Sequence, residues 1–199
     1  MFSTPDSTTL ASRLLAVIEE DILPLTERAV AAGNKVFGAA LLTKSDLSLV
    51  IAGTNDETGN PLWHGEINTL RQFYERADRP STKDLVFLTT HEPCTLCMSA
   101  ITWAGFDNYY YFYSHEDSRD SFAIPHDLTI LKELFGLDPG GYRRTNSFWT
   151  AYSIADLIDT EAEPLRKELL ARRDRIRARY DSLSMEYQKT KGDNDIPLN

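Results

Sequence analysis

The chain has 199 residues, of which 42% are hydrophobic and 26% are charged, and its formal net charge is −9. Such a composition is typical of a globular domain with a substantial core. The negative charge repels polyanions at long range, which argues against a nucleic-acid binder without excluding a local basic patch. No stretch approaches the roughly 20 apolar residues that cross a bilayer, and residues 1–6 lack the features of a signal peptide. We therefore expect a cytoplasmic protein without a membrane partner.

The first half of the chain alternates between helical and extended patterns. Apolar residues at three- and four-residue steps predict a helix over residues 8–32, which Pro24 should break or kink. Residues 36–43 and 47–53 read as two strands of a hairpin. A second amphipathic helix is expected over residues 64–76.

Two further strands flank a helix in the next segment. Residues 85–89 form a short apolar run, typical of a buried strand, and residues 91–93 read as a turn. A helix is expected over residues 94–104, followed by an aromatic-rich strand over residues 108–113. The order of these elements predicts a mixed sheet with helices packed on it.

The remainder of the chain is expected to be mainly helical. A helix is predicted over residues 127–137, with a stop at residues 138–141, and Ser147 could cap a segment over residues 148–159. Pro164 opens a long helix that should run to about residue 189, and residues 192–199 read as a disordered tail.

Two short motifs carry the chemistry. His64-Gly65-Glu66 opens one expected helix, and Pro93-Cys94-Thr95-Leu96-Cys97 opens another; these are the chain's two cysteines. Side chains at i and i+3 share a helix face, so both sulfurs can reach one ion. One imidazole and two thiolates suit zinc and leave a fourth position for water. Zinc lowers the pKa of that water to about neutrality.

Glu66 is the candidate catalytic residue. It shares the ligand-bearing turn but is not needed as a ligand, so it can carry protons between the water, a ring nitrogen and a departing amine. A redox pair would explain only the cysteines. A structural zinc would need a fourth protein ligand, and His91 lies too near Cys94 across a turn to supply it. The joint occurrence of the two motifs is the pattern of zinc deaminases.

The chain resembles the cytidine deaminase-like superfamily, in particular the branch with guanine deaminases, yeast-type cytosine deaminases and tRNA adenosine deaminases. The resemblance covers residues 36–117 and rests on six segments: Phe37-Gly38-Ala39, Asn55, His64-Gly65-Glu66-Ile67-Asn68-Thr69-Leu70, Glu92-Pro93-Cys94-Thr95-Leu96-Cys97, Trp103 and His115-Glu116-Asp117. The glycine between ligand and carboxylate is similar to that of cytosine deaminases; most relatives have alanine there. The segment after Asp117 departs from the guanine deaminase pattern.

The resemblance implies an α/β fold, a three-layer α-β-α sandwich with a central mixed five-stranded sheet, here with a C-terminal helical extension. It also implies a zinc cofactor and a homodimer. Candidate substrate contacts are Asn55, Phe37, Gly65, Trp103 and His91. Three of these residues also have a purely structural interpretation: core packing for Phe37, a turn-holding role for His91, and an Asx-turn for Asn55.

Together these observations predict a zinc-dependent deaminase domain over residues 1–160, a long helix packed on or flanking it over residues 161–191, and the tail. The expected reaction removes an exocyclic amine from a cytosine- or guanine-like nucleobase or nucleoside through zinc-bound hydroxide. The alternatives are a tRNA adenosine deaminase, for which the arginines of the last helix would have to bind RNA, and a non-catalytic binding module. The intact Glu66 argues against the latter.

Overall fold

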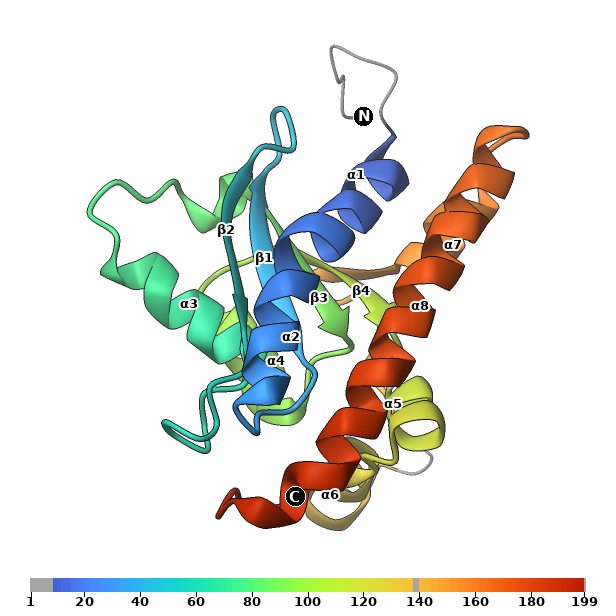
Figure 1. Ribbon diagram of the computed structural model, residues 1–199. Helices are drawn as coiled ribbons and strands as arrows, with labels where there is room; N and C mark the ends of the chain where they lie inside the picture. Colours follow the sequence, from blue (N-terminus) through green and yellow to red (C-terminus); the bar gives the residue numbers. More distant parts are fainter. Residues whose placement is uncertain (1–8, 138–139, 199) are drawn as a thin grey trace.

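A computed structural model describes residues 9–137 and 140–198 of the chain (Figure 1). Residue 8, where we expected the first helix to begin, lies outside this part, as do residues 138–139 of the expected helix stop and the last residue of the tail. No helix in the described ranges is long and apolar enough to cross a membrane.

The centre of the fold is a five-stranded mixed sheet in the order β2-β1-β3-β4-β5. Strands β1 (Gly38–Thr43) and β2 (Leu49–Thr54) form the predicted antiparallel hairpin, and β1 also pairs antiparallel with β3 (Leu85–His91). Strands β3, β4 (Asn108–Tyr113) and β5 (Thr150–Ser153) run parallel. The predicted α/β fold with a mixed sheet is confirmed.

The first helical run is interrupted next to Pro24, as predicted. Helix α1 (Leu10–Val17) starts at the N-cap Thr9, passes into a π-helical turn η1 (Ile18–Ile22), and continues as α2 (Leu23–Ala31). Proline has no N–H to donate to the carbonyl four residues earlier. The N–H of Leu23 bonds to the Ile18 carbonyl instead, which is the wider π-type ring.

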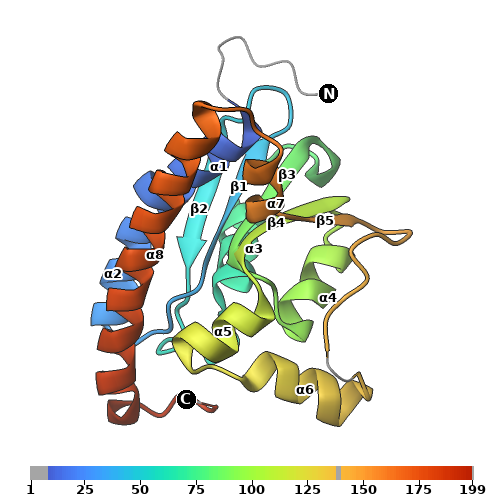
Figure 2. The same cartoon turned by 90° about the vertical axis from the view of Figure 1, so that its right-hand side faces the viewer.

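One face of the sheet is covered by α3 (Gly65–Glu75) and α4 (Thr95–Trp103), the two helices that begin at the His64 and Cys94 motifs. Helix α3 follows the β2 loop, and α4 follows the end of β3. A 3₁₀ turn, η2 (Thr82–Asp84), leads into β3. Helices α1, α2 and α8 (Leu165–Thr190) lie on the opposite side, so the molecule has the predicted three layers (Figures 1 and 2).

The C-terminal region differs from the sequence prediction at two places. Residues 115–122 form a helix, α5 (His115–Phe122), which we did not predict, before α6 (His126–Phe135). Residues 148–159 are not one segment but strand β5 followed by α7 (Ile154–Asp159). The prediction there was wrong because Trp149, Ala151 and Ser153 point alternately inward, which is the period of a strand.

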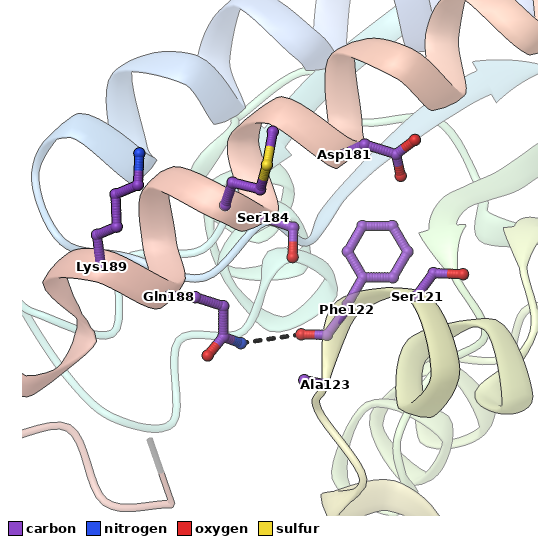
Figure 3. A pocket seen from close by; sticks show the side chains of 8 residues that line it. Ser121, Phe122, Ala123, Asp181, Ser184, Gln188 and Lys189 are labelled. Carbon is purple, nitrogen blue, oxygen red and sulfur yellow. Dashed lines mark hydrogen bonds between the residues drawn. The ribbon is translucent and has the colours of Figure 1, made fainter.

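The chain ends against the N-terminal helices. A 3₁₀ turn, η3 (Lys191–Asp193), follows α8; the Asn194 side chain donates to the Gly33 carbonyl at 3.0 Å, and Ile196 is buried. A hollow of about 390 Å³ lies between the end of α5 and α8, where Gln188 donates to the Phe122 carbonyl at 2.9 Å (Figure 3). Its lining contains neither histidine nor cysteine.

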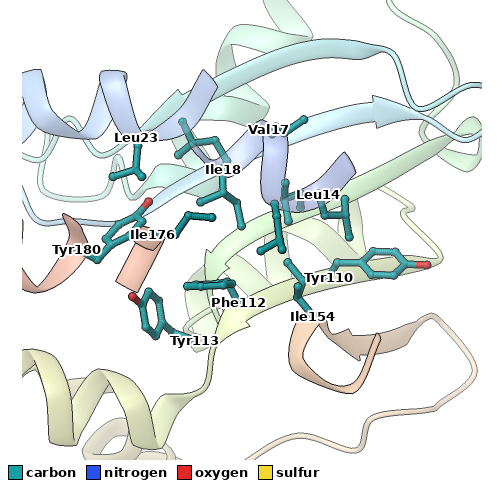
Figure 4. Packing of buried hydrophobic residues seen from close by; sticks show 14 of the residues in the cluster. Leu14, Val17, Ile18, Leu23, Tyr110, Phe112, Tyr113, Ile154, Ile176 and Tyr180 are labelled. Carbon is teal, nitrogen blue, oxygen red and sulfur yellow. The ribbon is translucent and has the colours of Figure 1, made fainter. Parts of the chain in front are cut away.

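Two apolar clusters hold the layers together, one on each face of the sheet. Alternate residues of each strand face opposite sides, so Ala39 and Leu41 of β1 pack under α3 and α4, whereas Ala40 and Leu42 pack under α1 and α2. The second cluster continues to Ile154 of α7 and to the inner face of α8 (Figure 4). The first cluster, which includes Leu70 and Phe73 of α3 and Met98 and Ile101 of α4, fixes both motif helices against the sheet.

Candidate metal centre and active site

The three expected metal ligands meet at the adjacent starts of α3 and α4. His64 is the N-cap of α3, Cys94 is the N-cap of α4, and Cys97 lies in the first turn of α4. The His64 Nδ1 atom is 3.4 Å from the Cys94 Sγ and 3.7 Å from the Cys97 Sγ. All three ligand atoms lie within 4.8 Å of one another.

This spacing fits zinc. Zinc bonds of about 2.3 Å to sulfur and about 2.05 Å to nitrogen place the two atoms about 3.6 Å apart in a tetrahedral site. The observed nitrogen–sulfur distances bracket that value. The hydrogen bond from the Cys97 side chain and the nearby His64 imidazole also lower the pKa of the Cys94 thiol, which favours a ligating thiolate.

Glu66 lies beside the ligands and is buried. Its carboxylate accepts a hydrogen bond of 3.0 Å from the Thr89 hydroxyl, and the side chain is turned toward the end of β3. Burial and the neighbouring Cys94 raise the pKa of Glu66 to about 7. A carboxyl group whose pKa lies near the operating pH can both give and take a proton.

A small cavity opens at these residues. Its lining includes five of the residues expected at the site, together with two carboxylates that we did not predict: Phe37, His64, Glu66, His91, Cys94, Glu92 and Asp127. The cavity volume is about 30 Å³, and one water molecule needs roughly 10–15 Å³. The cavity therefore has room for about two waters, and a heterocycle can enter only if part of the wall moves.

His91 belongs to the end of β3 rather than to the turn in which we expected it. Its ring lies 4.6 Å from the Phe37 ring and stacks on Tyr113 at 4.7 Å. Its Nδ1 is 3.0 Å from the Thr90 hydroxyl, and its Nε2 has no hydrogen-bond partner among the described residues. Burial, Arg177 and His115 lower the pKa of His91 to about 3, so the ring is neutral.

Asp127 reaches the cavity from the first turn of α6. Burial and the charge of Cys94 raise the pKa of Asp127 to about 6. Glu92 also contacts α5, because its carboxylate accepts from the His115 backbone at 3.3 Å. Glu92 adjoins the Pro93-Cys94 motif, whereas no local pattern indicated Asp127, because α6 reaches the site only through the path of the intervening chain.

Asn55 and Gly65 lie behind the cavity instead of in its lining. The Asn55 side-chain oxygen accepts from the Gly65 N–H, and its Nδ2 donates to Glu57 at 2.6 Å. Gly65 is packed against β1, and a Cβ atom there would lie 2.8 Å from the Gly38 Cα. Their substrate contacts remain predictions, whereas their observed contacts position the start of α3.

The structure does not bring Trp103 to the site. Trp103 ends α4, at the opposite end from Cys94, and its side chain is 91% exposed. With Leu96 and Ser99 it forms an exposed stripe along α4. Trp103 is therefore remote from the cavity of its own chain.

The arginines of α8 contact carboxylates. Arg172 donates to Glu19 and Glu20 at 2.6 Å each, and Arg179 pairs with Glu27 of α2. Other arginines of this helix make similar pairs: Arg166 with Asp159, Arg173 with Asp174, Arg175 with Glu19, and Arg177 with Asp117. Much of the basic character that suggested RNA binding is neutralised within the chain.

Comparison with known proteins shows which families the chain is similar to. Residues 19–113 match the model of the cytidine and deoxycytidylate deaminase zinc-binding region. Over 115 residues the chain is 29% identical to the guanine deaminase of Bacillus subtilis (strain 168), covering 57% of this chain and 69% of that protein.

Solved structures share the fold. A mutant of NE0047 in complex with 8-azaguanine aligns with a TM-score of 0.56 and 18% identity, covering 92% of this chain and 85% of that chain. The structure of guanine deaminase from Bacillus subtilis aligns with a TM-score of 0.51 and 24% identity, covering 66% and 85%. In its zinc-binding region, its curated relative and its sheet architecture, the chain is similar to proteins of the cytidine deaminase-like superfamily.

Proposed function

We propose that this protein is a zinc-dependent hydrolytic deaminase of a nucleobase or nucleoside. The observation that carries the proposal is the meeting of His64, Cys94 and Cys97 beside a buried Glu66. His64, Cys94 and Cys97 would hold the metal. Zinc supplies Lewis-acid activation of a water nucleophile at neutral pH.

Glu66 would move the protons of the reaction. Water replaces the exocyclic amine, so the ring carbon gains an oxygen and ammonia leaves. The Glu66 carboxylate takes a proton from the water, delivers it to a ring nitrogen, and later passes a proton to the departing amine. The Thr89 hydroxyl, at 3.0 Å, holds the carboxylate in place between these steps.

The lining favours a substrate without a phosphate. Glu66, Glu92 and Asp127 supply carboxyl groups to the cavity wall, and the lining contains neither lysine nor arginine. A nucleotide phosphate near this wall would be repelled. We therefore propose a free base or nucleoside, with guanine tested first because a guanine deaminase is a curated relative, and cytosine next.

Ammonia release from the zinc-loaded protein tests this proposal. We expect product from at least one of guanine, cytosine, their nucleosides or pterins, and less from the matching nucleoside monophosphate. Failure with every ring, at full zinc occupancy, would contradict the deaminase assignment and favour a binding module.

Substitution of Glu66 separates chemistry from metal binding. Glu66→Gln keeps the side-chain shape and should bind zinc as before, while kcat falls by on the order of 10² to 10⁴. Glu75→Gln changes an exposed carboxylate at the end of the same helix and should leave kcat unchanged. Equal activity of Glu66→Gln and wild type would remove Glu66 from its proposed role.

We also propose a homodimer and a cytoplasmic location. The exposed stripe of Leu96, Ser99 and Trp103 on α4 supports a subunit contact, because large apolar side chains are enriched at such interfaces. Sedimentation of the wild type and of Trp103→Ser tests the dimer. The variant should dissociate at a higher protein concentration than the wild type, and a monomeric wild type would contradict the proposed dimer.

A further inference from the structure

A buried ion pair lies behind the metal ligands. Lys35, in the loop between α2 and β1, places its Nζ 2.8 Å from the Glu57 Oε1, and the two side chains are 7% and 1% exposed. Removing two charges from water costs several kcal/mol per ion, so such a pair is weak evidence for stability by itself. Its other contacts indicate what it does.

The Glu57 carboxylate faces the far side of the metal ligand His64. Glu57 Oε1 lies 3.7 Å from the His64 Nε2, within ion-pair range, while the His64 Nδ1 faces the two sulfurs. A ligating Nδ1 must be unprotonated, which places the ring hydrogen on Nε2. A carboxylate beside Nε2 stabilises this tautomer and fixes the ring orientation.

The second oxygen of the same carboxylate holds the start of α3. Glu57 Oε2 accepts from the Asn55 Nδ2 at 2.6 Å, and the Asn55 Oδ1 accepts from the Gly65 N–H. Gly65 lies between His64 and Glu66. One buried carboxylate therefore lies 3.7 Å from the ligand ring and, through Asn55, holds the backbone between ligand and proton carrier.

Lys35 keeps this arrangement electrically balanced. The site already gathers two thiols and the Glu66 carboxyl, so a further unpaired anion would be costly in a buried position. The Lys35 ammonium donates to Oε1 of Glu57, the oxygen that faces His64, and it offsets the charge of Glu57 without itself lying in the cavity lining.

We propose that Glu57, charge-balanced by Lys35, is a positioning residue that orients His64 for zinc and fixes the first turn of α3. The proposal rests on the proposed zinc site. It predicts that the pair contributes mainly to metal affinity and much less to folding stability.

Zinc affinity of the full chain, measured by competition with a chelator of known affinity, tests this role. Three variants are compared with wild type: Glu57→Gln, Lys35→Gln, and the double variant. Loss of such an outer carboxylate typically weakens metal binding by about 10- to 100-fold. We expect that loss in Glu57→Gln and in the double variant, and a smaller one in Lys35→Gln, which retains the carboxylate.

The unfolding free energy of the zinc-free protein is measured in parallel. The double variant buries no unpaired charge, so its stability should stay close to that of wild type even if a single variant folds poorly. Lys44→Gln is the matched control, because it breaks the partly exposed Lys44–Asp107 pair (2.7 Å) away from the site. Its zinc affinity should equal that of wild type.

Wild-type zinc affinity in the double variant would overturn the proposal, whatever its stability, since the pair would then serve packing alone. A tenfold weaker zinc affinity in Lys44→Gln would overturn it as well, because the effect would not be specific to Glu57. Absence of zinc binding by the wild-type protein is a distinct result, which refutes the proposed function itself.

Discussion

Replacing Gly65 by alanine should disturb both the fold and the site. The added Cβ would lie 2.8 Å from the Gly38 Cα, 2.8 Å from the Phe37 carbonyl oxygen and 2.9 Å from the Gly38 nitrogen. Ordinary contacts between such atoms are about 3.5–4.0 Å. All three partners are backbone atoms of β1 and the residue before it, so no side-chain rotation can relieve the overlap.

The magnitude follows from two opposing effects. Overpacking of this kind costs typically 1–3 kcal/mol, and rigid backbone neighbours place Gly65→Ala near the upper end. Alanine recovers about 0.5–1 kcal/mol relative to glycine inside a helix. The expected net loss of unfolding free energy is about 2 kcal/mol. Because α3 must move away from β1, His64 and Glu66 shift together, and kcat should fall by on the order of 10- to 100-fold.

Urea unfolding and steady-state kinetics on the same preparation measure both effects. Gly192→Ala is the control, since a Cβ there meets nothing within 4 Å, and its stability should stay within about 0.5 kcal/mol of wild type. A Gly65→Ala protein with wild-type stability and activity would refute the close packing of α3 on β1.

Further substitutions test the buried His91 in the cavity wall and the ion pairs of α8. The pKa of His91 is lowered to about 3, against about 6.5 when unfolded; the unfolded state therefore binds the extra proton as pH falls from 7 to 5. The unfolding free energy of the wild type should therefore fall by about 2 kcal/mol between pH 7 and pH 5 because of His91. His91→Phe should lack this fall. Urea titrations that show the same loss of stability with acid in both proteins would contradict the prediction. Arg172→Met removes two contacts of 2.6 Å to Glu19 and Glu20 and should cost about 1 kcal/mol. Arg173→Met removes only a pair with its sequence neighbour and should cost less than about 0.5 kcal/mol; similar thermal midpoints for both variants would show that α8 is not held by these pairs.

The metal ligands could be predicted because their geometry is local. Cys94 and Cys97 are one helical turn apart, and His64 and Glu66 share the start of α3, so residue types and spacing were sufficient to indicate the cluster.

The carboxylates around the site could not be predicted in the same way. Asp127 is 33 positions beyond Cys94 by residue number, and its approach depends on how α5 and α6 turn. Lys35 and Glu57 meet from separate loops. Helix α5 was missed although it carries a readable signal, a capping box between Ser114 and Asp117.

Trp103 shows the limit of transfer from relatives. The resemblance suggested a substrate contact, but the helical phase of α4 directs this side chain to solvent while Cys97 and Ile101 point inward. A role suggested by resemblance can be assigned to a helical residue only if that residue lies on the helix face that points to the site.

The ion pairs between α8 and the N-terminal helices have a kinetic consequence. Arg172 and Glu19 are 153 positions apart, so this side of the sheet cannot close until the synthesised chain extends past α8. Until then the apolar residues that α8 covers, such as Tyr113 of β4 beneath Tyr180, stay uncovered, and folding of this layer has a high contact order. Nascent chains that stall before α8 should consequently be substrates for chaperones that hold exposed hydrophobic surface.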